Sequence, residues 1–271
     1  MWKNQKYNKL LHSFIHAMHY YVFSKHAKGY SIHSPFVFTL ITKVLLEAKT
    51  KSNITKTKKL RSVYLQNKTI IEQSNQGAGS RINNETKGTT IGKLTKQSGL
   101  KTKYISLLTT MAKHYAFKNI LELGTCTGLT TTALAQACPN AKITTIENAP
   151  ARANWAKENL EKLQLTNVKL IQQDFSFVIN YIKRHQQKYD MIFIDGNHTY
   201  NATIEYFEKL QSSINEDGVI IFDDIYWSPE MTNAWKQICQ AQTLGITIDL
   251  YRMGLLIRRD NQHKEHFTIR Y

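Results

Sequence analysis

The second half of the sequence predicts an α/β fold with a doubly wound, mostly parallel sheet of seven strands. From residue 119 onward, short apolar stretches alternate with longer amphipathic ones, as expected for strands and for helices that cover both faces of a parallel sheet. A glycine turn from Gly124 to Gly128 joins the first of these strands to the first helix. The last two strands meet at Met253-Gly254, a connection short enough for a hairpin, so the last strand is expected to run antiparallel.

The elements of this half are predicted from the period of the apolar residues and from the residue types at the element ends. Strands are expected at 119–123, 142–147, 168–173, 190–195, 218–223, 246–252 and 255–259. Helices are expected at 129–137, 150–164, 175–187, 200–214 and 229–242. Residues 104–271 are therefore predicted to form the main domain.

Residues 1–103 are predicted to be a basic, mainly helical N-terminal extension with flexible loops. Ser34-Pro35 is typical of an N-cap followed by the first residue of a helix, whereas lysine-rich and threonine-rich segments are typical of solvated loops. The expected elements are a helix within 5–24, a helix from Ser34-Pro35 to about Glu47, a loop at 49–59, a helix at 60–73, a mobile loop or lid at 74–103 and a helix from Thr102 to His114.

The positive charge of the chain is concentrated in its first 115 residues. The formal net charge is +16 at pH 7, and residues 1–115 hold 20 Lys and Arg residues against 3 Asp and Glu residues. Residues 116–271 hold 16 against 17. Such asymmetry indicates an anionic partner, which could be nucleic acid, a phosphorylated or CoA-linked acceptor or a membrane surface, or else a solubilising basic tail.

Composition and cysteine usage favour a globular protein of the reducing cytoplasm. Hydrophobic residues make up 42% of the chain, and no apolar run approaches the ~20 residues that span a membrane. Histidines interrupt the N-terminal stretch that would otherwise suggest a signal peptide. Cys126, Cys138 and Cys239 have the spacing of neither a disulfide framework nor a zinc site. A homodimer remains open.

The residues around the glycine turn indicate a nucleotide-like ligand. A glycine turn lets a ligand approach the backbone, where the helix N-terminus offers unpaired N–H groups. Glu147 ends the next strand 19 residues after Gly128, close to the ~20-residue distance at which nucleotide-binding folds place a carboxylate on ribose hydroxyls. A dinucleotide site would need Gly-x-Gly-x-x-Gly, but Cys126 stands at the middle position. Glu122, two residues before the first glycine, suits a ligand with a positively charged, phosphate-free end.

The stretch from Asn119 to Thr130 closely resembles the first motif of class I S-adenosylmethionine-dependent methyltransferases. Its form Glu-Leu-Gly-x-x-x-Gly is most similar to the catechol and caffeoyl-CoA O-methyltransferase branch, and segments 32–38 and 77–80 resemble an uncharacterised bacterial subgroup of this superfamily. The resemblance covers about 110–260 and implies a Rossmann-like fold with S-adenosylmethionine as cofactor. It implies that the cofactor is bound by Glu122, Gly124, Thr125, Cys126, Thr127, Gly128, Glu147, Asn148, Asp174, Phe175 and Asp195.

The parts of this set have different expected roles. The turn and Glu122 would hold the methionine portion, Glu147 the ribose, and Asp174 with Phe175 the adenine. Asp174 can equally be the N-cap of the helix at 175–187, because an Asp side chain accepts hydrogen bonds from the N–H groups of the first turn. One residue can serve both purposes.

Three carboxylates end neighbouring strands of the predicted domain, at the edge where ligands of open α/β sheets bind. These are Asp195, Asp223 and Asp224. Carboxylates that converge repel each other unless a cation lies among them, and oxygen ligands favour Mg²⁺, Ca²⁺ or Mn²⁺. Because the same positions match metal ligands of the resembled family, the three are predicted to hold a divalent cation, Mg²⁺ or Mn²⁺. Alternatively, one member of the Asp pair caps the following helix or turn while the other meets solvent.

Asp195 and His198 are the candidate catalytic residues. Several metal-dependent relatives have a second acid in the loop after the first strand-end Asp, where this chain has Asn197, which cannot accept a proton. His198 is the replacement candidate, because an imidazole titrates near physiological pH.

The sequence therefore predicts an S-adenosylmethionine-dependent enzyme that methylates an oxygen of a small hydroxylated metabolite or sugar, with the basic N-terminal residues as a cap over the acceptor. An RNA methyltransferase, such as a tRNA hydroxyuridine O-methyltransferase, is an alternative that the positive extension supports through phosphate contacts. A non-catalytic cofactor-binding or interaction protein on the same scaffold is another, because fold does not fix function. An NAD(P) oxidoreductase is disfavoured by Cys126 and the missing glycine.

Overall fold

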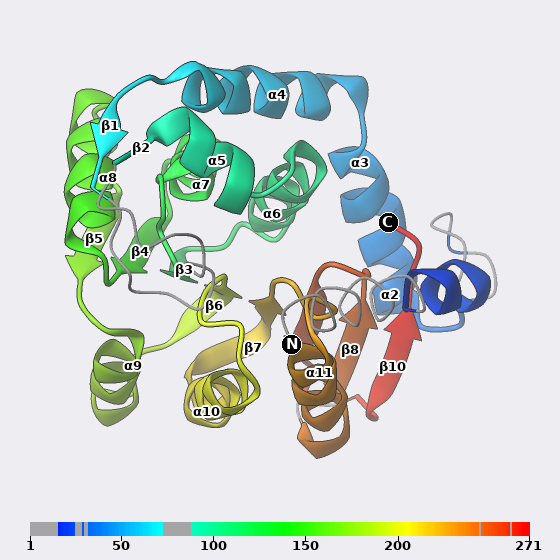
Figure 1. Ribbon diagram of the computed structural model, residues 1–271. Coiled ribbons are helices and arrows are strands. Elements are labelled where there is room, and N and C mark those ends of the chain that lie inside the picture. Colours follow the sequence, from blue (N-terminus) through cyan, green and yellow to red (C-terminus); the bar gives the residue numbers. More distant parts are fainter. Residues whose placement is uncertain (1–15, 25–28, 30–31, 73–87, 244, 261) are drawn as a thin grey trace, which may run out of the picture. The chain divides into compact units, whose positions relative to one another are not determined.

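The computed structural model describes residues 16–24, 29, 32–72, 88–243, 245–260 and 262–271. Contacts within the chain define two compact units. The first unit is Ser34–Val178, and the second combines Ile179–Tyr271 with residues of Met1–His33. Figure 1 shows the helices and strands of both units. The division into an extension at 1–103 and a domain at 104–271 stays a prediction.

Three parallel strands form the centre of the first unit. β3 (Asn119–Leu123) pairs with β4 (Lys142–Glu147), and β4 pairs with β5 (Val168–Gln172). α7 (Leu129–Ala137) follows β3, and α8 (Pro150–Lys162) follows β4, so each crossover contains one helix. The last four residues of β3 are buried, as expected for a parallel strand covered on both faces. The bounds of these five elements agree with the prediction to within two residues.

The second unit contains the remaining predicted strands. β6 (Tyr189–Ile194) and β7 (Ile214–Phe222) are parallel neighbours. β9 (Gly254–Arg258) runs antiparallel between β7 and β8 (Gly245–Asp249). The helices of this unit are α10 (Tyr200–Leu210), with the 3-10 turn η2 (Gln211–Ser213), and α11 (Pro229–Ala241). α9 (Phe175–Arg184) begins in the first unit and ends in the second. The predicted Rossmann-like α/β class, mostly parallel with an antiparallel β9, is confirmed.

β10 (Glu265–Thr268) adds a strand to the seven that the sequence predicts. It pairs in parallel with β8 and so extends the sheet of the second unit beyond the hairpin. Phe267 is its one buried residue. Because apolar periodicity is the main strand signal, four residues with a single buried side chain are not recognisable as a strand from sequence.

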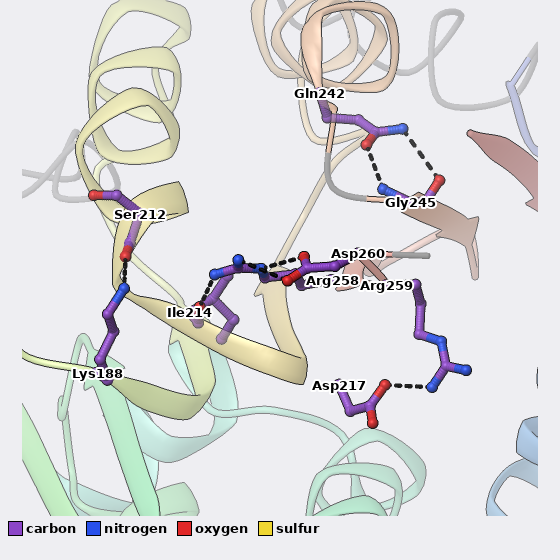
Figure 2. A network of polar contacts seen from close by, with 9 residues as sticks. All are labelled: Lys188, Ser212, Ile214, Asp217, Gln242, Gly245, Arg258, Arg259 and Asp260. Carbon is purple, nitrogen blue, oxygen red and sulfur yellow. Dashed lines mark hydrogen bonds and ion pairs between the residues drawn. The ribbon is translucent and has the colours of Figure 1, made fainter. Parts of the chain in front are cut away.

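Polar contacts join the strand ends of the second unit that lie opposite the carboxyl ends of β6 and β7 (Figure 2). Lys188 donates to the Ser212 carbonyl at 2.6 Å, just before β6. Arg258, at the end of β9, donates to the Ile214 carbonyl at 2.9 Å and pairs with Asp260. Because water screens charges at the protein surface, these contacts are expected to contribute little to stability.

The N-terminal segment is helical where the structure describes it near Ser34. The predicted helix from Ser34-Pro35 is present as α2 (Pro35–Thr39), the π-helical η1 (Leu40–Leu45) and α3 (Leu46–Ala48). Residues 16–23 are also helical, within the helix predicted at 5–24, whose first part lies outside the described residues.

The predicted loop at 49–59 is wrong. Most of these residues belong to α4 (Lys51–Gln66), which starts after the N-cap Thr50 and ends before the predicted limit at 73. Thr57 and Tyr64 are its buried residues, so α4 shows little of the apolar period that reveals a helix. Its Lys, Arg and Gln residues are nevertheless good helix formers. The helix lies against α5 (Ile91–Ser98), α6 (Thr102–His114) and α7 (Figure 1).

The predicted loop or lid at 74–103 is partly wrong. Residues 73–87, which include the Gly-Ala-Gly-Ser stretch, lie outside the described residues. The part that follows contains β2 (Thr89–Thr90), which pairs antiparallel with β1 (Ile70–Ile71), and then α5. The predicted helix from Thr102 to His114 is confirmed as α6. Among the described helices, none is both long and apolar enough to span a membrane.

Candidate functional site

The turn from Gly124 to Gly128 ties the start of α7 to the carboxyl end of β4. Gly124 and Thr125 both donate their N–H groups to the Ile146 carbonyl, at 2.9 and 3.1 Å. Gly124 adopts φ 108° and Gly128 adopts φ 77°, conformations that a residue without a Cβ reaches at little cost. Cys126 between them adopts φ 51°. The turn predicted from the glycine spacing is therefore present.

The Glu147 side chain is bonded to this turn. Its Oε2 accepts a hydrogen bond from the Cys126 N–H at 2.9 Å, and its Oε1 accepts one from the Ala149 N–H at 2.9 Å. The residue is 6% exposed. The structure thus brings together the turn and the acid that the sequence predicts as neighbours, and two backbone donors fix the carboxylate at the end of β4.

Glu122 lies fully buried beneath the turn. Its Oε2 accepts hydrogen bonds from Thr131 Oγ1 at 2.5 Å and Thr145 Oγ1 at 2.7 Å. Its Oε1 has no hydrogen-bond partner among the residues that the structure describes. Burial raises the pKa of Glu122 to about 7, although the two threonine hydroxyls act in the opposite direction. A buried carboxylate oxygen without a partner fits a site whose ligand brings a positive group.

The remaining predicted cofactor residues of the first unit lie at the ends of β4 and β5. Asn148 and Asp174 are exposed, and Phe175 is half-buried. Asp174 Oδ1 accepts a hydrogen bond from the Ser176 N–H at 2.8 Å, so it caps the start of α9. Its expected role at the adenine stays a prediction.

Tyr64 connects the N-terminal segment to the glycine turn. Its buried hydroxyl lies 2.7 Å from Thr132 Oγ1, accepts from Asn159 Nδ2 at 2.7 Å and donates to the Gly128 carbonyl at 3.3 Å. Residues of α4, α7 and α8 therefore share one polar centre next to the turn.

Replacing Tyr64 with phenylalanine is expected to lower the free energy of unfolding by about 1–3 kcal/mol, because it leaves buried partners of the hydroxyl unsatisfied. Urea denaturation of the full chain measures the change. Val63→Ala, at an exposed position of the same helix, is the control and should change stability by less than about 0.5 kcal/mol. Equal effects of the two substitutions would contradict the importance of this hydroxyl.

A second cluster follows the strands of the second unit. Asp223 and Asp224 lie just beyond the last residue of β7, and Asp223 is buried. Arg252 donates to both oxygens of Asp223, with Nη2–Oδ2 at 2.6 Å and Nε–Oδ1 at 2.9 Å. The Arg252 Nε also lies 3.3 Å from Asp224 Oδ1. Burial lowers the pKa of Arg252, but the hydrogen bonds and charges of Asp223, then of Asp224 and Asp195, raise it more, so the guanidinium stays protonated.

Asp195 and His198 form a pair in the loop after β6. The His198 Nε2 lies 3.6 Å from Asp195 Oδ1. Burial lowers the pKa of His198, the Asp223 charge opposes this shift and the Arg252 charge adds to it. Asn197 adopts φ 49° and donates from Nδ2 to the Tyr206 hydroxyl at 3.3 Å. The structure thus places an imidazole beside a carboxylate, and the catalytic role of the two residues stays a prediction.

Residues of the basic N-terminal segment line part of a pocket of about 360 Å³ in the first unit. Its cationic lining consists of Lys43, Lys56, Lys113 and His114. The pocket borders the C-terminal half of α7, whereas the glycine turn lies at the N-terminal end of that helix. Some of the predicted positive surface therefore lies at the opposite end of α7 from the turn.

Residues 121–225, which include the glycine turn, Glu147 and the strand-end carboxylates, match the family model described as methyltransferase domain. This segment is therefore similar to a methyltransferase domain, as the resemblance of the first motif predicts.

One relative of this chain is a catechol O-methyltransferase of Niastella koreensis. The two proteins are 30% identical over 126 residues, which covers 45% of this chain and 55% of that enzyme. The chain thus spans little more than half the length of this relative.

Two solved structures resemble the fold of the methyltransferase domain. An O-methyltransferase from Bacillus cereus in complex with SAH has a TM-score of 0.53 at 15% identity, covering 82% of this chain and 96% of that one. An SAH-bound methyltransferase from Podospora anserina has a TM-score of 0.52 at 18% identity, covering 60% and 80%. At these identities the likeness concerns the fold alone.

The strand-end carboxylates Asp223 and Asp224 lie beside a cation of the protein, the Arg252 guanidinium. Within the described part of the chain, no group of three His, Cys, Asp or Glu residues is placed to hold a metal ion. Because β7 ends at Phe222, Asp223 and Asp224 both lie beyond the strand, where both contact Arg252. That Asp195, Asp223 and Asp224 hold Mg²⁺ or Mn²⁺ stays a prediction.

Sequence reasoning missed three residues of the two clusters. Arg252 falls in the stretch predicted as a strand at 246–252, but it lies after β8 in the hairpin connection. Thr131 and Thr145, the partners of Glu122, lie within α7 and β4. The available signal for Arg252 was a cation in a short connection next to strand-end acids. For the two threonines, it was a hydroxyl side chain at a position expected to be buried.

Proposed function

We propose that this chain transfers a methyl group from S-adenosylmethionine to an oxygen of a small hydroxylated acceptor, a metabolite or a sugar. The observation that carries the proposal is the bond between the Glu147 carboxylate and the Cys126 N–H, which holds the glycine turn beside the strand-end acid. A nucleoside with free ribose hydroxyls suits this arrangement, because a carboxylate accepts hydrogen bonds from them. Likeness to a catechol O-methyltransferase supports oxygen as the acceptor atom.

The first unit supplies the proposed cofactor contacts. The partnerless Oε1 of Glu122 would accept from the positively charged amino group of the methionine portion. The turn from Gly124 to Gly128 presents backbone to the same portion. The other proposed contacts are Glu147 and Asn148 to the ribose, and Asp174 and Phe175 to the adenine.

The second unit supplies the proposed acceptor chemistry. S-adenosylmethionine brings a methyl group that is already activated on a sulfonium centre. The protein therefore has to orient the acceptor and remove its hydroxyl proton. His198 would take this proton, since its lowered pKa leaves the imidazole neutral at physiological pH. Asp195 beside its Nε2 would stabilise the imidazolium that forms.

Calorimetric titration with S-adenosylhomocysteine tests the cofactor half of the proposal. We expect micromolar binding, with a free energy on the order of −8 kcal/mol. Turnover of S-adenosylmethionine with pools of hydroxylated metabolites and sugars tests the transfer. No binding would contradict the proposal, and binding without turnover in any pool would favour the non-catalytic alternative.

A salt titration with bulk tRNA separates the RNA methyltransferase alternative from a small acceptor. Binding through phosphate contacts weakens steeply as salt rises, because counterions are released. Steeply salt-dependent binding would favour the RNA alternative, whereas no binding would remove it. A homodimer and a cytoplasmic setting stay predictions.

A further inference from the structure

Arg252 is held in place by the backbone of the hairpin that carries it. The Leu250 N–H donates to the Met253 carbonyl at 2.9 Å, which closes the turn between β8 and β9. The Ile225 N–H donates to the Arg252 carbonyl at 3.1 Å, which joins the turn to the loop after Asp224. Gly254 lies so close to Trp235 that a Cβ there would meet ring carbons at 2.6 Å. The guanidinium is therefore presented by a rigid turn.

The guanidinium and the carboxylates form one ion-paired cluster. Arg252 donates hydrogen bonds to Asp223 from Nε and Nη2, and its Nε also faces Asp224. The Asp223 side chain is 0% exposed and the Arg252 side chain 21% exposed, so water screens this pair poorly. A bidentate pair between arginine and a carboxylate is the strongest and most directional form of such an ion pair.

A divalent ion would have to compete with this pair. To bind Asp223, it would displace the guanidinium and leave a buried positive charge beside its own. Both carboxylate oxygens of Asp223 already accept hydrogen bonds from Arg252. The guanidinium therefore disfavours metal binding, and its positive charge offsets the repulsion between the carboxylates.

We propose that Arg252 is the resident cation of the strand-end carboxylates, a positioning residue that takes the place of a divalent ion in this methyltransferase domain. The guanidinium fixes Asp223 and Asp224 and keeps the acceptor side of the domain ordered without a metal. Its consequence for catalysis rests on the proposed function: methyl transfer is independent of divalent cations.

Manganese binding to the full chain tests the proposal without requiring an acceptor. We expect no Mn²⁺ binding at the cluster in the wild type, measured by calorimetry and by the Mn²⁺ electron paramagnetic resonance signal. Arg252→Ala removes the guanidinium from the acids, so this variant should bind one Mn²⁺ with an affinity at least roughly tenfold above the detection limit that the wild type does not reach. Mn²⁺ should also raise the melting temperature of this variant and not that of the wild type.

Two further variants serve as controls. Arg252→Lys keeps a positive charge at the cluster and should remain insensitive to Mn²⁺. Arg252→Ala combined with Asp223→Asn removes the buried carboxylate and should lose the Mn²⁺ response of the single variant. If Arg252→Ala does not fold, Arg252→Gln, which keeps hydrogen-bond donors, replaces it in the comparison.

Specific Mn²⁺ binding to the wild type at this cluster would overturn the proposal, as would equal Mn²⁺ responses of the wild type and Arg252→Ala. Turnover that a chelator abolishes and Mg²⁺ restores would overturn its catalytic consequence. If no acceptor is methylated, the proposed function fails, yet the Mn²⁺ comparison still decides the role of Arg252.

Discussion

Replacing Glu147 with alanine is expected to weaken the binding of S-adenosylhomocysteine at least about 100-fold, roughly 2.7 kcal/mol. The substitution removes the proposed acceptor of the ribose hydroxyls, and hydrogen bonds to a charged group contribute about 1.5–3 kcal/mol each. It also removes the bond that holds the Cys126 N–H, so the glycine turn loses its connection to the end of β4. Calorimetry with the purified full chain measures the change.

Glu161→Ala is the matched control for Glu147→Ala, because Glu161 is an exposed acid on α8. Its affinity for S-adenosylhomocysteine should equal that of the wild type. Glu147→Gln should fall between the two, since an amide oxygen still accepts hydrogen bonds but carries no charge. Full affinity in Glu147→Ala, with the fold intact by circular dichroism, would remove the ribose assignment.

The glycine turn and Glu147, which are proposed to hold the cofactor, could be predicted from the sequence because their signals are local. Strand, turn and helix follow each other within Asn119–Ala137, and the glycines mark the positions with positive φ. Glu147 ends the next strand of a parallel pair, so the register of β3 and β4 alone places it beside the turn. Periodicity, glycine chemistry and one crossover are sufficient for this part.

Of the second cluster, which is proposed to serve the acceptor, only the acids could be predicted. Their convergence follows from the strand ends, and the need for a cation follows from their charge. Which cation satisfies them depends on the Arg252 contact, which joins residues 29 positions apart through the hairpin. No local pattern encodes such a contact.

The errors in the N-terminal segment have a different physical cause. α4 presents mostly charged and hydroxyl side chains and buries few residues, so its composition resembles that of a solvated loop. Its contacts with α5, α6 and α7 stabilise it as a helix, and these contacts are tertiary.

The pH dependence of Glu122 gives the second large expected effect. Its pKa is raised by burial from 4.5 to about 7 in the folded chain. Between these values the folded state holds a proton that the unfolded state has lost, so stability falls as pH rises across this window. The shift corresponds to roughly 3 kcal/mol. Glu122→Gln should remove this fall, which urea denaturation between pH 4.5 and 8 measures.

The same carboxylate should link cofactor binding to proton release. A ligand that places a positive group beside Glu122 favours the ionised form, so the affinity of the wild type for S-adenosylhomocysteine should rise as pH increases through 7. Near pH 7, binding should release roughly half a proton, measurable by calorimetry in buffers of different ionisation enthalpy. Glu122→Gln should bind at least about tenfold more weakly at pH 8 and release no proton. A wild-type affinity that does not change with pH would contradict the placement of the amino group, whereas the stability measurement would still report the buried acid.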